Sequence, residues 1–185
     1  MAKKIRIEWE GSYSLEDIGY NKNEDSYSIT KNTFLNDGNI DYGIYQVYGS
    51  HPVYGTDVLL YIGKAQKQTF AKRLSQEAWE YNEDFQNIKF YIGRLFDEKQ
   101  VSNEEWDEMI DKAEQMLIYA HSPAKNSSNI LNISRNDERL KELENIRVLN
   151  YDSYRSLMPE VSGEIFIKEF KKYNGVFGSK ELKNG

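Results

Sequence analysis

The chain has 185 residues, a formal net charge of −6 and no cysteine. That length suits one domain with a buried core, and the missing cysteines exclude disulfides and thiolate metal sites. Its two histidines, His51 and His121, leave little material for a histidine zinc site or a serine–histidine–aspartate triad. The acidic balance argues against a protein that coats nucleic acid through bulk charge.

No segment approaches the roughly 20 apolar residues that cross a membrane, and no apolar run near the N-terminus resembles a signal peptide. We therefore expect a cytoplasmic protein without a membrane partner. Tyrosine is abundant, with 14 copies. Any catalysis would have to use Tyr, Asp, Glu, Lys and Arg side chains.

Residues 1–41 predict an N-terminal extension that packs on the core. Apolar and polar residues alternate over 4–10, which predicts a strand. Ser14 can accept a backbone N–H and is followed by acids, a pattern typical of a short capped helix. Residues 21–40 are rich in Asn, Asp, Ser and Lys and predict mainly a loop.

Residues 42–126 predict the core of the fold. Its expected elements are strands rich in tyrosine and β-branched residues, at 42–48, 57–62 and 87–96, and helices at 68–82 and 102–121. Ser102 and Glu105 have the spacing of a capping box at the start of the second helix. Two glycines and a proline between the first two strands predict a hairpin with a long loop.

Residues 127–173 predict a C-terminal extension of the same domain, and 174–185 a flexible tail. Within the extension, the pattern favours helices at 137–145 and 162–173 and a strand at 146–151. The whole order predicts an α/β fold in which a small, mainly antiparallel β-sheet is sandwiched by helices.

One acidic residue interrupts the apolar side of the 102–121 helix. Glu114 lies one turn from Ile110 and one turn from Leu117, at the edge of a stripe that the spacing predicts to be buried. Two alternatives explain a carboxylate there. It forms an ion pair with a nearby Lys or Arg, or it is a ligand of a hard divalent cation, which prefers carboxylate oxygen.

A window without acids, residues 58–76, holds four basic residues in an otherwise acidic chain: Lys64, Lys67, Lys72 and Arg73. The window runs from a strand through a glycine turn into a helix, an arrangement that suits phosphate. The alternative is a solvated basic helix, since lysines are common on surface helices.

Four motifs follow one another in the central segment: Gly43-Ile44-Tyr45, Tyr61-Ile62-Gly63, "KA…TFAKRL" and "AEQMLIYAHSPAKN". In this order, over residues 42–126, they resemble the GIY-YIG nuclease superfamily. A second Tyr-Ile-Gly, at 91–93, falls in the third strand, where that family has no catalytic motif. We therefore interpret Tyr91 and Ile92 as sheet packing.

The resemblance implies a role for each matching polar residue. Tyr45 and Tyr61 would flank the reacting phosphate, and one of them would take the proton of the attacking water. Arg73 would bind the phosphate and stabilise the charge on its oxygens. Lys64 would be a second phosphate-binding cation. On physical grounds, Lys64 and Arg73 would also favour the phenolate form of a neighbouring tyrosine.

The remaining matches concern the metal and the shape of the site. Glu114 would hold a single divalent metal, Mg²⁺ or Mn²⁺, at the leaving oxygen. Asn126 would help to close the site, and Gly43 and Gly63 would shape the turns.

Two positions depart from the family pattern. Where many members have a histidine four residues after the helix arginine, this chain has Glu77, which either points away from substrate or acts as the base itself. The 15 residues between Tyr45 and Tyr61 are more than minimal members have, so "SHPVYGTD" predicts an added loop. Its His51 either reaches the site or lies on the surface.

The leading function is therefore a metal-dependent endonuclease that hydrolyses phosphodiester bonds of DNA, with double-stranded DNA as substrate. The alternative is a nucleic-acid or protein binding module that keeps the fold with little or no catalysis. A homodimer and the choice between restriction and repair remain open at this level.

Overall fold

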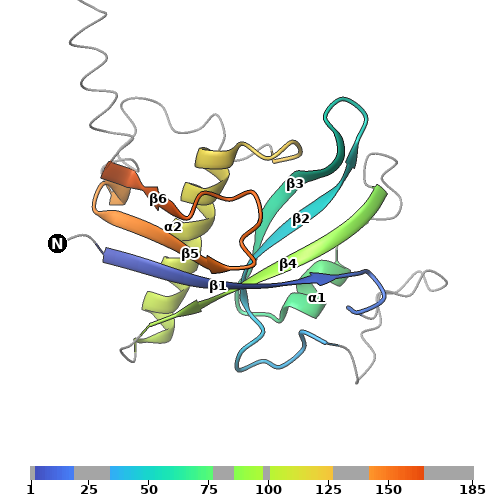
Figure 1. The fold of residues 1–185 in the computed structure, drawn as a ribbon. Helices are drawn as coiled ribbons and strands as arrows, with labels where there is room; N and C mark the ends of the chain where they lie inside the picture. Colours follow the sequence, from blue (N-terminus) through green and yellow to red (C-terminus); the bar gives the residue numbers. More distant parts are fainter. Residues whose placement is uncertain (1–2, 19–33, 77–85, 98–100, 127–141, 165–185) are drawn as a thin grey trace, which may run out of the picture.

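The computed structural model describes residues 3–18, 34–76, 86–97, 101–126 and 142–164. These residues build an α/β fold of strands and two helices (Figure 1). In chain order the elements are β1 (Lys3–Tyr13), β2 (Gly43–His51), β3 (Gly55–Ala65), α1 (Phe70–Ser75), β4 (Gln86–Phe96), α2 (Asn103–His121), β5 (Ile146–Asp152) and β6 (Glu160–Ser162).

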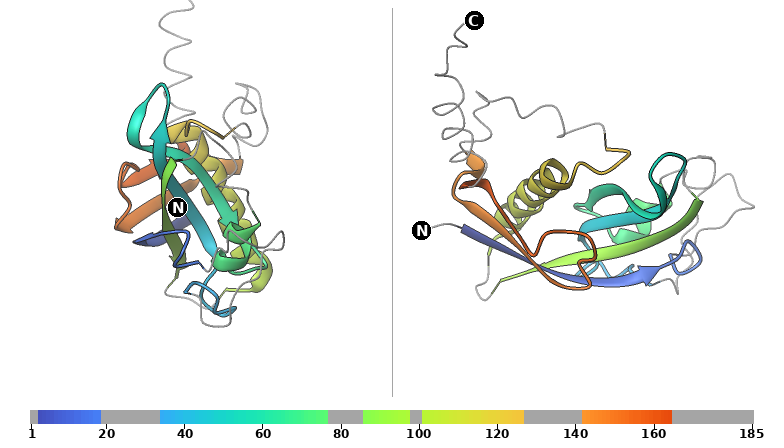
Figure 2. Two further views of the ribbon diagram at one scale, coloured as in Figure 1. Left: turned by 90° about the vertical axis from the view of Figure 1, so that its right-hand side faces the viewer. Right: turned by 45° about the horizontal axis from the view of Figure 1, so that its top comes forward.

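All six of these strands belong to one sheet, in the order β3-β2-β4-β1-β5-β6. Within the described ranges, β1 and β5 run parallel and the other neighbouring pairs run antiparallel. The mainly antiparallel sheet predicted from the sequence is therefore confirmed. The sheet curls, and α2 lies on its concave side (Figures 1 and 2).

The two helices pack against opposite faces of the β2–β3–β4 part of the sheet. Successive side chains of a strand point to opposite faces. Ile44 belongs to the apolar cluster that contains the buried side of α2, whereas the next residue, Tyr45, belongs to the cluster that contains Phe70 and Leu74 of α1. A sheet covered by helices on both faces is thus present among the described residues.

The start of α2 agrees with its predicted cap. The side chain of Ser102 accepts a hydrogen bond from the backbone N–H of Glu105, at 3.2 Å. The second half of the predicted capping box is replaced, because the Glu105 carboxylate contacts Lys3 of β1 at 2.8 Å. This contact attaches the N-terminus of α2 to the first strand.

The predicted long loop between β2 and β3 is wrong. The strands continue to His51 and Gly55, which pair with each other, and only residues 52–54 form the turn. The ring nitrogen Nδ1 of His51 accepts the backbone N–H groups of Val53 and Tyr54, at 3.1 and 3.3 Å. These hydrogen bonds hold a short turn. Most residues expected in the loop pair in the β2–β3 ladder instead, with register shifts along β2.

Three other expectations change or lie outside the described residues. The helix expected from Ser14 is a set of turns over 15–18, in which the Asp17 carboxylate accepts the N–H and hydroxyl of Ser14. Strand β6 was not predicted, and it takes the start of the expected 162–173 helix, of which only 163–164 are described as helical. Most of the expected 137–145 helix and the second half of the 68–82 helix lie outside the described residues.

The second Tyr-Ile-Gly packs within the sheet, as predicted. Tyr91 is 7% exposed and belongs to the apolar cluster on the α2 side, where its ring meets Tyr48 edge to face with centroids 5.5 Å apart. A Cβ on Gly93 would lie 2.6 Å from a methyl of Ile7. Glycine at 93 therefore lets β1 and β4 pack closely.

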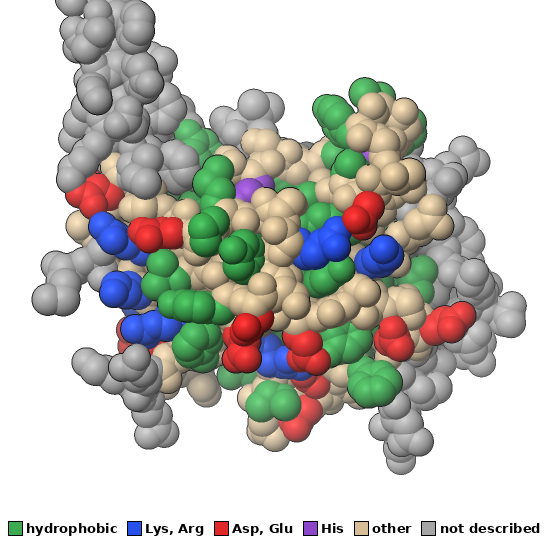
Figure 3. All heavy atoms as spheres, in the orientation of Figure 1, with side chains coloured by type: hydrophobic (Ala, Val, Ile, Leu, Met, Phe, Trp, Pro, Cys, Tyr) green, Lys and Arg blue, Asp and Glu red, His purple; other side chains and the backbone are tan. Residues whose placement is uncertain are grey.

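On the face shown in Figure 3, Lys and Arg side chains lie next to Asp and Glu. Arg94 contacts Glu10 at 2.6 Å, and Arg155 contacts Asp57 at 2.7 Å. Among the described residues, basic side chains are thus often paired with acidic ones.

Candidate active site

A small pocket of about 230 Å³ lies beside the edge strand β3. It is lined by Tyr61, Lys64, Gln66, Gln68, Arg73 and Glu114. Four of the residues singled out in the sequence thus come together from β3, α1 and α2. We call this cavity the Tyr61 pocket.

The position of β3 explains why distant residues meet here. Strand β3 is at the edge of the sheet, with α1 over one face and α2 over the other. Side chains of both helices can therefore extend to the outer edge of β3. Tyr61 points to the α1 side and Lys64 to the α2 side, as the alternation of strand side chains requires. Arg73 comes from α1 and Glu114 from the middle of α2.

Tyr45 lies behind the pocket and is not among the residues that line it. It is completely buried, and its ring is stacked on Tyr61 with centroids 6.1 Å apart and an interplanar angle of 29°. A Cβ on Gly63 would lie only 2.5 Å from the Tyr45 hydroxyl oxygen. Gly63 lies within β3 and not in a turn, so its predicted role as a turn glycine is wrong; instead it makes room for the tyrosine pair. The other motif glycine, Gly43, starts β2 with a φ of 144° against the carbonyl of Gly93.

Lys64 joins two carboxylates of α2. Its Nζ contacts Asp111 Oδ1 and lies 3.2 Å from Glu114 Oε2. Burial lowers the pKa of Lys64, but the contacts with Asp111 and Glu114 outweigh this and raise it above the ordinary value. Burial raises the pKa of Glu114, while the charges of Lys64 and, more weakly, Arg73 offset part of that rise. The ion pair expected for Glu114 is present, and its ionised form still carries a burial penalty.

The same carboxylates fit a divalent metal as a donor set. Mg²⁺ in proteins commonly uses one or two carboxylates and keeps several waters. Asp111 and Glu114, one turn apart on α2, already direct an oxygen each toward one cation, the ammonium of Lys64. A metal at Glu114 would compete with that ammonium, which could stay on Asp111.

Asp111 was missed as a site residue, because acids on a helix are usually exposed to solvent and no motif includes this one. The useful signal is its spacing, since residues three apart on a helix are neighbours. Gln66 and Gln68 were also missed. Both lie in the short segment between β3 and α1, where the sequence carries no motif.

Asn126 binds the backbone of the middle residue of Tyr61-Ile62-Gly63. Its Oδ1 accepts the N–H of Ile62 at 2.9 Å, and its Nδ2 donates to the carbonyl of Ile62 at 2.8 Å. Beside it, the N–H of Lys125 donates to the carbonyl of Leu60 at 2.8 Å. The segment after α2 thus covers the edge of β3 and fixes the strand that carries Tyr61.

We expect Asn126→Ala to lower the free energy of unfolding by about 2–4 kcal/mol, because two buried backbone groups of Ile62 lose their partners. The melting temperature should fall by several degrees or more. Thermal unfolding followed by circular dichroism measures this change. Asn126→Asp should also be destabilised: it keeps an acceptor for the Ile62 N–H, but its carboxylate turns a charged oxygen toward the Ile62 carbonyl. Equal stability of Asn126→Ala and the unchanged protein would contradict this role.

The two residues given as possible members of the site, His51 and Glu77, are also not placed in the pocket. His51 lies in the β2–β3 turn, where its Nδ1 accepts backbone N–H groups and its ring stacks on Tyr54 with centroids 4.6 Å apart. It pairs with Gly55, six residues along β3 from Tyr61, or about 20 Å at the usual rise of a strand. Glu77 lies outside the described residues.

No family model, curated protein or solved structure matches the chain. Among the described residues, no helix is long and apolar enough to cross a membrane. In the same ranges, no three His, Asp or Glu side chains converge as a ready-made metal site.

Proposed function

We propose that this protein is a metal-dependent endonuclease that hydrolyses phosphodiester bonds of DNA, as the GIY-YIG nucleases that it resembles do. The observation that carries the proposal is the convergence of Tyr61, Arg73 and Glu114 on one pocket from three separate elements. A one-metal phosphodiester hydrolysis needs a base for the water, a cation for the phosphoryl oxygens and a metal ligand, and a tyrosine, a guanidinium and a carboxylate can supply these three functions.

In the proposed reaction, Tyr61 accepts a proton from the attacking water while the water oxygen bonds to phosphorus. The bond from phosphorus to the leaving oxygen breaks, and that oxygen takes a proton from solvent. A phenol is mostly protonated near neutral pH. Lys64 and Arg73 line the same pocket, and their positive charges favour the phenolate form.

Arg73 binds the phosphate in this scheme. A guanidinium can donate two parallel hydrogen bonds to phosphate oxygens and stabilises the negative charge that grows on them. Glu114, assisted by Asp111, would hold Mg²⁺ or Mn²⁺, which when bound stabilises the leaving alkoxide. Lys64 keeps its contact with Asp111 and so balances the charge of the second carboxylate.

Supercoiled plasmid tests the proposal directly. Purified protein should convert it to nicked or linear forms with Mg²⁺ or Mn²⁺, and should leave it intact with chelator. The matched control is Arg73→Ala purified in the same way, which detects contaminating nucleases. Intact plasmid with either metal, over a range of protein concentrations, would contradict the nuclease proposal.

The alternative is a DNA-binding module with little or no catalysis. It is favoured by one observation: Lys64 contacts both Asp111 and Glu114, so each carboxylate already has a cationic partner within the chain. Retention of DNA in a binding assay, without cleavage in either metal, would select this alternative.

Removing single tyrosine hydroxyls should distinguish the two Tyr-Ile-Gly copies. We expect Tyr61→Phe to slow cleavage by about a hundredfold or more, the usual contribution of a general base. Tyr45→Phe should slow cleavage less, because Tyr45 acts only by supporting the Tyr61 ring on which it stacks. Tyr91→Phe should cleave at nearly the normal rate, because Tyr91 packs on the opposite side of the sheet. Initial rates of plasmid cleavage measure all three. If Tyr91→Phe slows cleavage most, the catalytic copy is the one at 91–93 and not the one at 61–63.

A further inference from the structure

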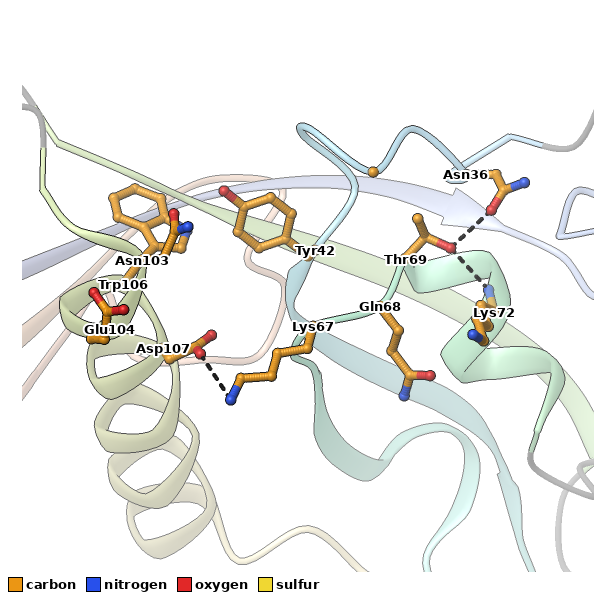
Figure 4. A pocket seen from close by; sticks show the side chains of 11 residues that line it. Asn36, Tyr42, Lys67, Gln68, Thr69, Lys72, Asn103, Glu104, Trp106 and Asp107 are labelled. Carbon is orange, nitrogen blue, oxygen red and sulfur yellow. Dashed lines mark hydrogen bonds and ion pairs between the residues drawn. The ribbon is translucent and has the colours of Figure 1, made fainter.

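A second, larger cavity adjoins the Tyr61 pocket. It has a volume of about 650 Å³, within the usual range of small-molecule sites, and we call it the Trp106 pocket. Gln68 lines both cavities. Figure 4 shows Tyr42 and Trp106 together on the α2 side and Lys72 on the α1 side, with Lys67 and Gln68 between them.

The α2 side of the Trp106 pocket has the chemistry of a nucleobase site. Tyr42 and Trp106 are only partly buried, so their rings are available for stacking. Asn103, Glu104 and Asp107 lie beside them. Carboxylate and amide oxygens accept hydrogen bonds from the exocyclic amino groups of adenine, cytosine and guanine, and thymine has no such group.

The other side of the pocket suits the sugar–phosphate backbone. Lys72 lines it and is exposed, and Lys67, also exposed, lies between the two sides. Lys67 has a left-handed backbone with a φ of 60°, and it contacts Asp107 at 3.5 Å, so it neutralises part of the acidic wall. Acids on the α2 side disfavour a phosphate there, whereas Lys72 on the α1 side favours one. This asymmetry orients a nucleotide with its base toward Trp106.

We infer that the Trp106 pocket binds an unpaired base with an exocyclic amino group (adenine, cytosine or guanine), in the nucleotide next to the phosphate held in the Tyr61 pocket. This inference rests on the proposed function, because the shared Gln68 makes the two cavities neighbouring subsites on one strand. A base can enter such a pocket only when it is outside the duplex stack, and unpairing is easiest at a bulge or mismatch. The protein therefore acts on DNA with a local unpaired base in preference to perfect duplex.

Binding of fluorescent oligonucleotides tests the inference without cleavage. Three duplexes are compared by anisotropy, in chelator and in Ca²⁺: one with a single bulged A, one with a bulged T, and one fully paired. We expect the bulged-A duplex to bind about tenfold more tightly than the paired one, as one stacked base allows. The bulged-T duplex should bind with intermediate affinity.

Substitutions on the aromatic wall identify the pocket. Trp106→Leu and Tyr42→Leu should each remove most of the preference for the bulge, whereas Trp106→Phe should keep most of it, because stacking needs a ring. Tyr151→Leu is the matched control: Tyr151 is 41% exposed on β5 and lines neither pocket, so the preference should be unchanged. Melting temperatures show whether each variant folds, and Gln68→Ala replaces any variant that does not.

The outcomes separate this inference from the nuclease proposal. Equal binding of bulged and paired duplexes by the unchanged protein, or a preference that survives both leucine variants, would overturn the base site. Plasmid cleavage without a bulge preference would overturn the base site alone. A bulge preference that depends on Trp106, without cleavage in Mg²⁺ or Mn²⁺, would support the base site and contradict the nuclease. Absence of all DNA binding would contradict both.

Discussion

Arg73→Ala should reduce plasmid cleavage by more than about a hundredfold while the protein stays folded. The guanidinium is proposed to stabilise charge on the phosphoryl oxygens, and loss of one such group commonly costs two or three orders of magnitude. Arg73 lies on the side of α1 that lines the Tyr61 pocket, whereas Phe70, Ala71 and Leu74 make the apolar contacts of that helix. Its truncation should therefore leave the melting temperature within a few degrees.

Two further variants make the Arg73 result specific. Arg73→Lys keeps the charge and loses the paired donors, so it should recover only part of the activity. Arg147→Ala removes an arginine of similar exposure on β5, where it contacts Glu160 at 3.5 Å, and should cleave normally. Near-normal cleavage by Arg73→Ala would reject the assigned role. An equal loss in Arg147→Ala would show a general charge effect instead.

The parts of the fold that could be predicted are those with local patterns. The five predicted strands at 4–10, 42–48, 57–62, 87–96 and 146–151 are all present, because the alternation of apolar residues or the richness in tyrosine and β-branched residues that predicted them is a property of each segment by itself. The start of α2 was predicted for a similar reason: Ser102 and the acids after it fit the cap and first turn of a helix.

The features of the fold that were not predicted depend on contacts between distant residues. The parallel pairing of β1 with β5 joins Lys3 to Ile146, and no local pattern encodes it. Strand β6 has three residues and exists because it pairs with β5. The β2–β3 loop was predicted too long because Gly and Pro indicate a turn but not its length. His51 shortens it through hydrogen bonds to the turn backbone.

The candidate site shows the same division. Tyr61, Lys64, Arg73 and Glu114 were selected from motifs and charge, and the fold brings all four to one cavity. The motif could not show that Tyr45 is fully buried behind Tyr61, or that Gly63 is required for their packing. It also could not show that Asp111 shares Lys64 with Glu114. These contacts depend on how α1 and α2 pack on the two faces of the sheet beside β3.

Glu114→Gln should abolish metal-dependent cleavage and leave the protein at least as stable at neutral pH. A neutral amide is a much weaker ligand for a hard cation than a carboxylate. The pKa of Glu114 is raised by burial above its ordinary value of 4.5, so the fold disfavours the ionised form. Stability is therefore lost as pH rises from the ordinary pKa through the raised one, and glutamine removes this loss. Lys64 keeps Asp111 as a partner after the substitution.

Melting temperature measured between about pH 4 and pH 8, together with plasmid cleavage, separates a metal ligand from a structural ion pair. The unchanged protein should lose part of its stability over this range, and Glu114→Gln should lose less. Asp111→Asn is the matched control: it removes the other contact of Lys64 but leaves the Glu114 carboxylate, so it should retain more cleavage than Glu114→Gln. If Glu114 serves only to pair Lys64, Glu114→Gln should unfold at lower temperature and still cleave. That combination would refute the metal site, whereas a stable and inactive variant would support it.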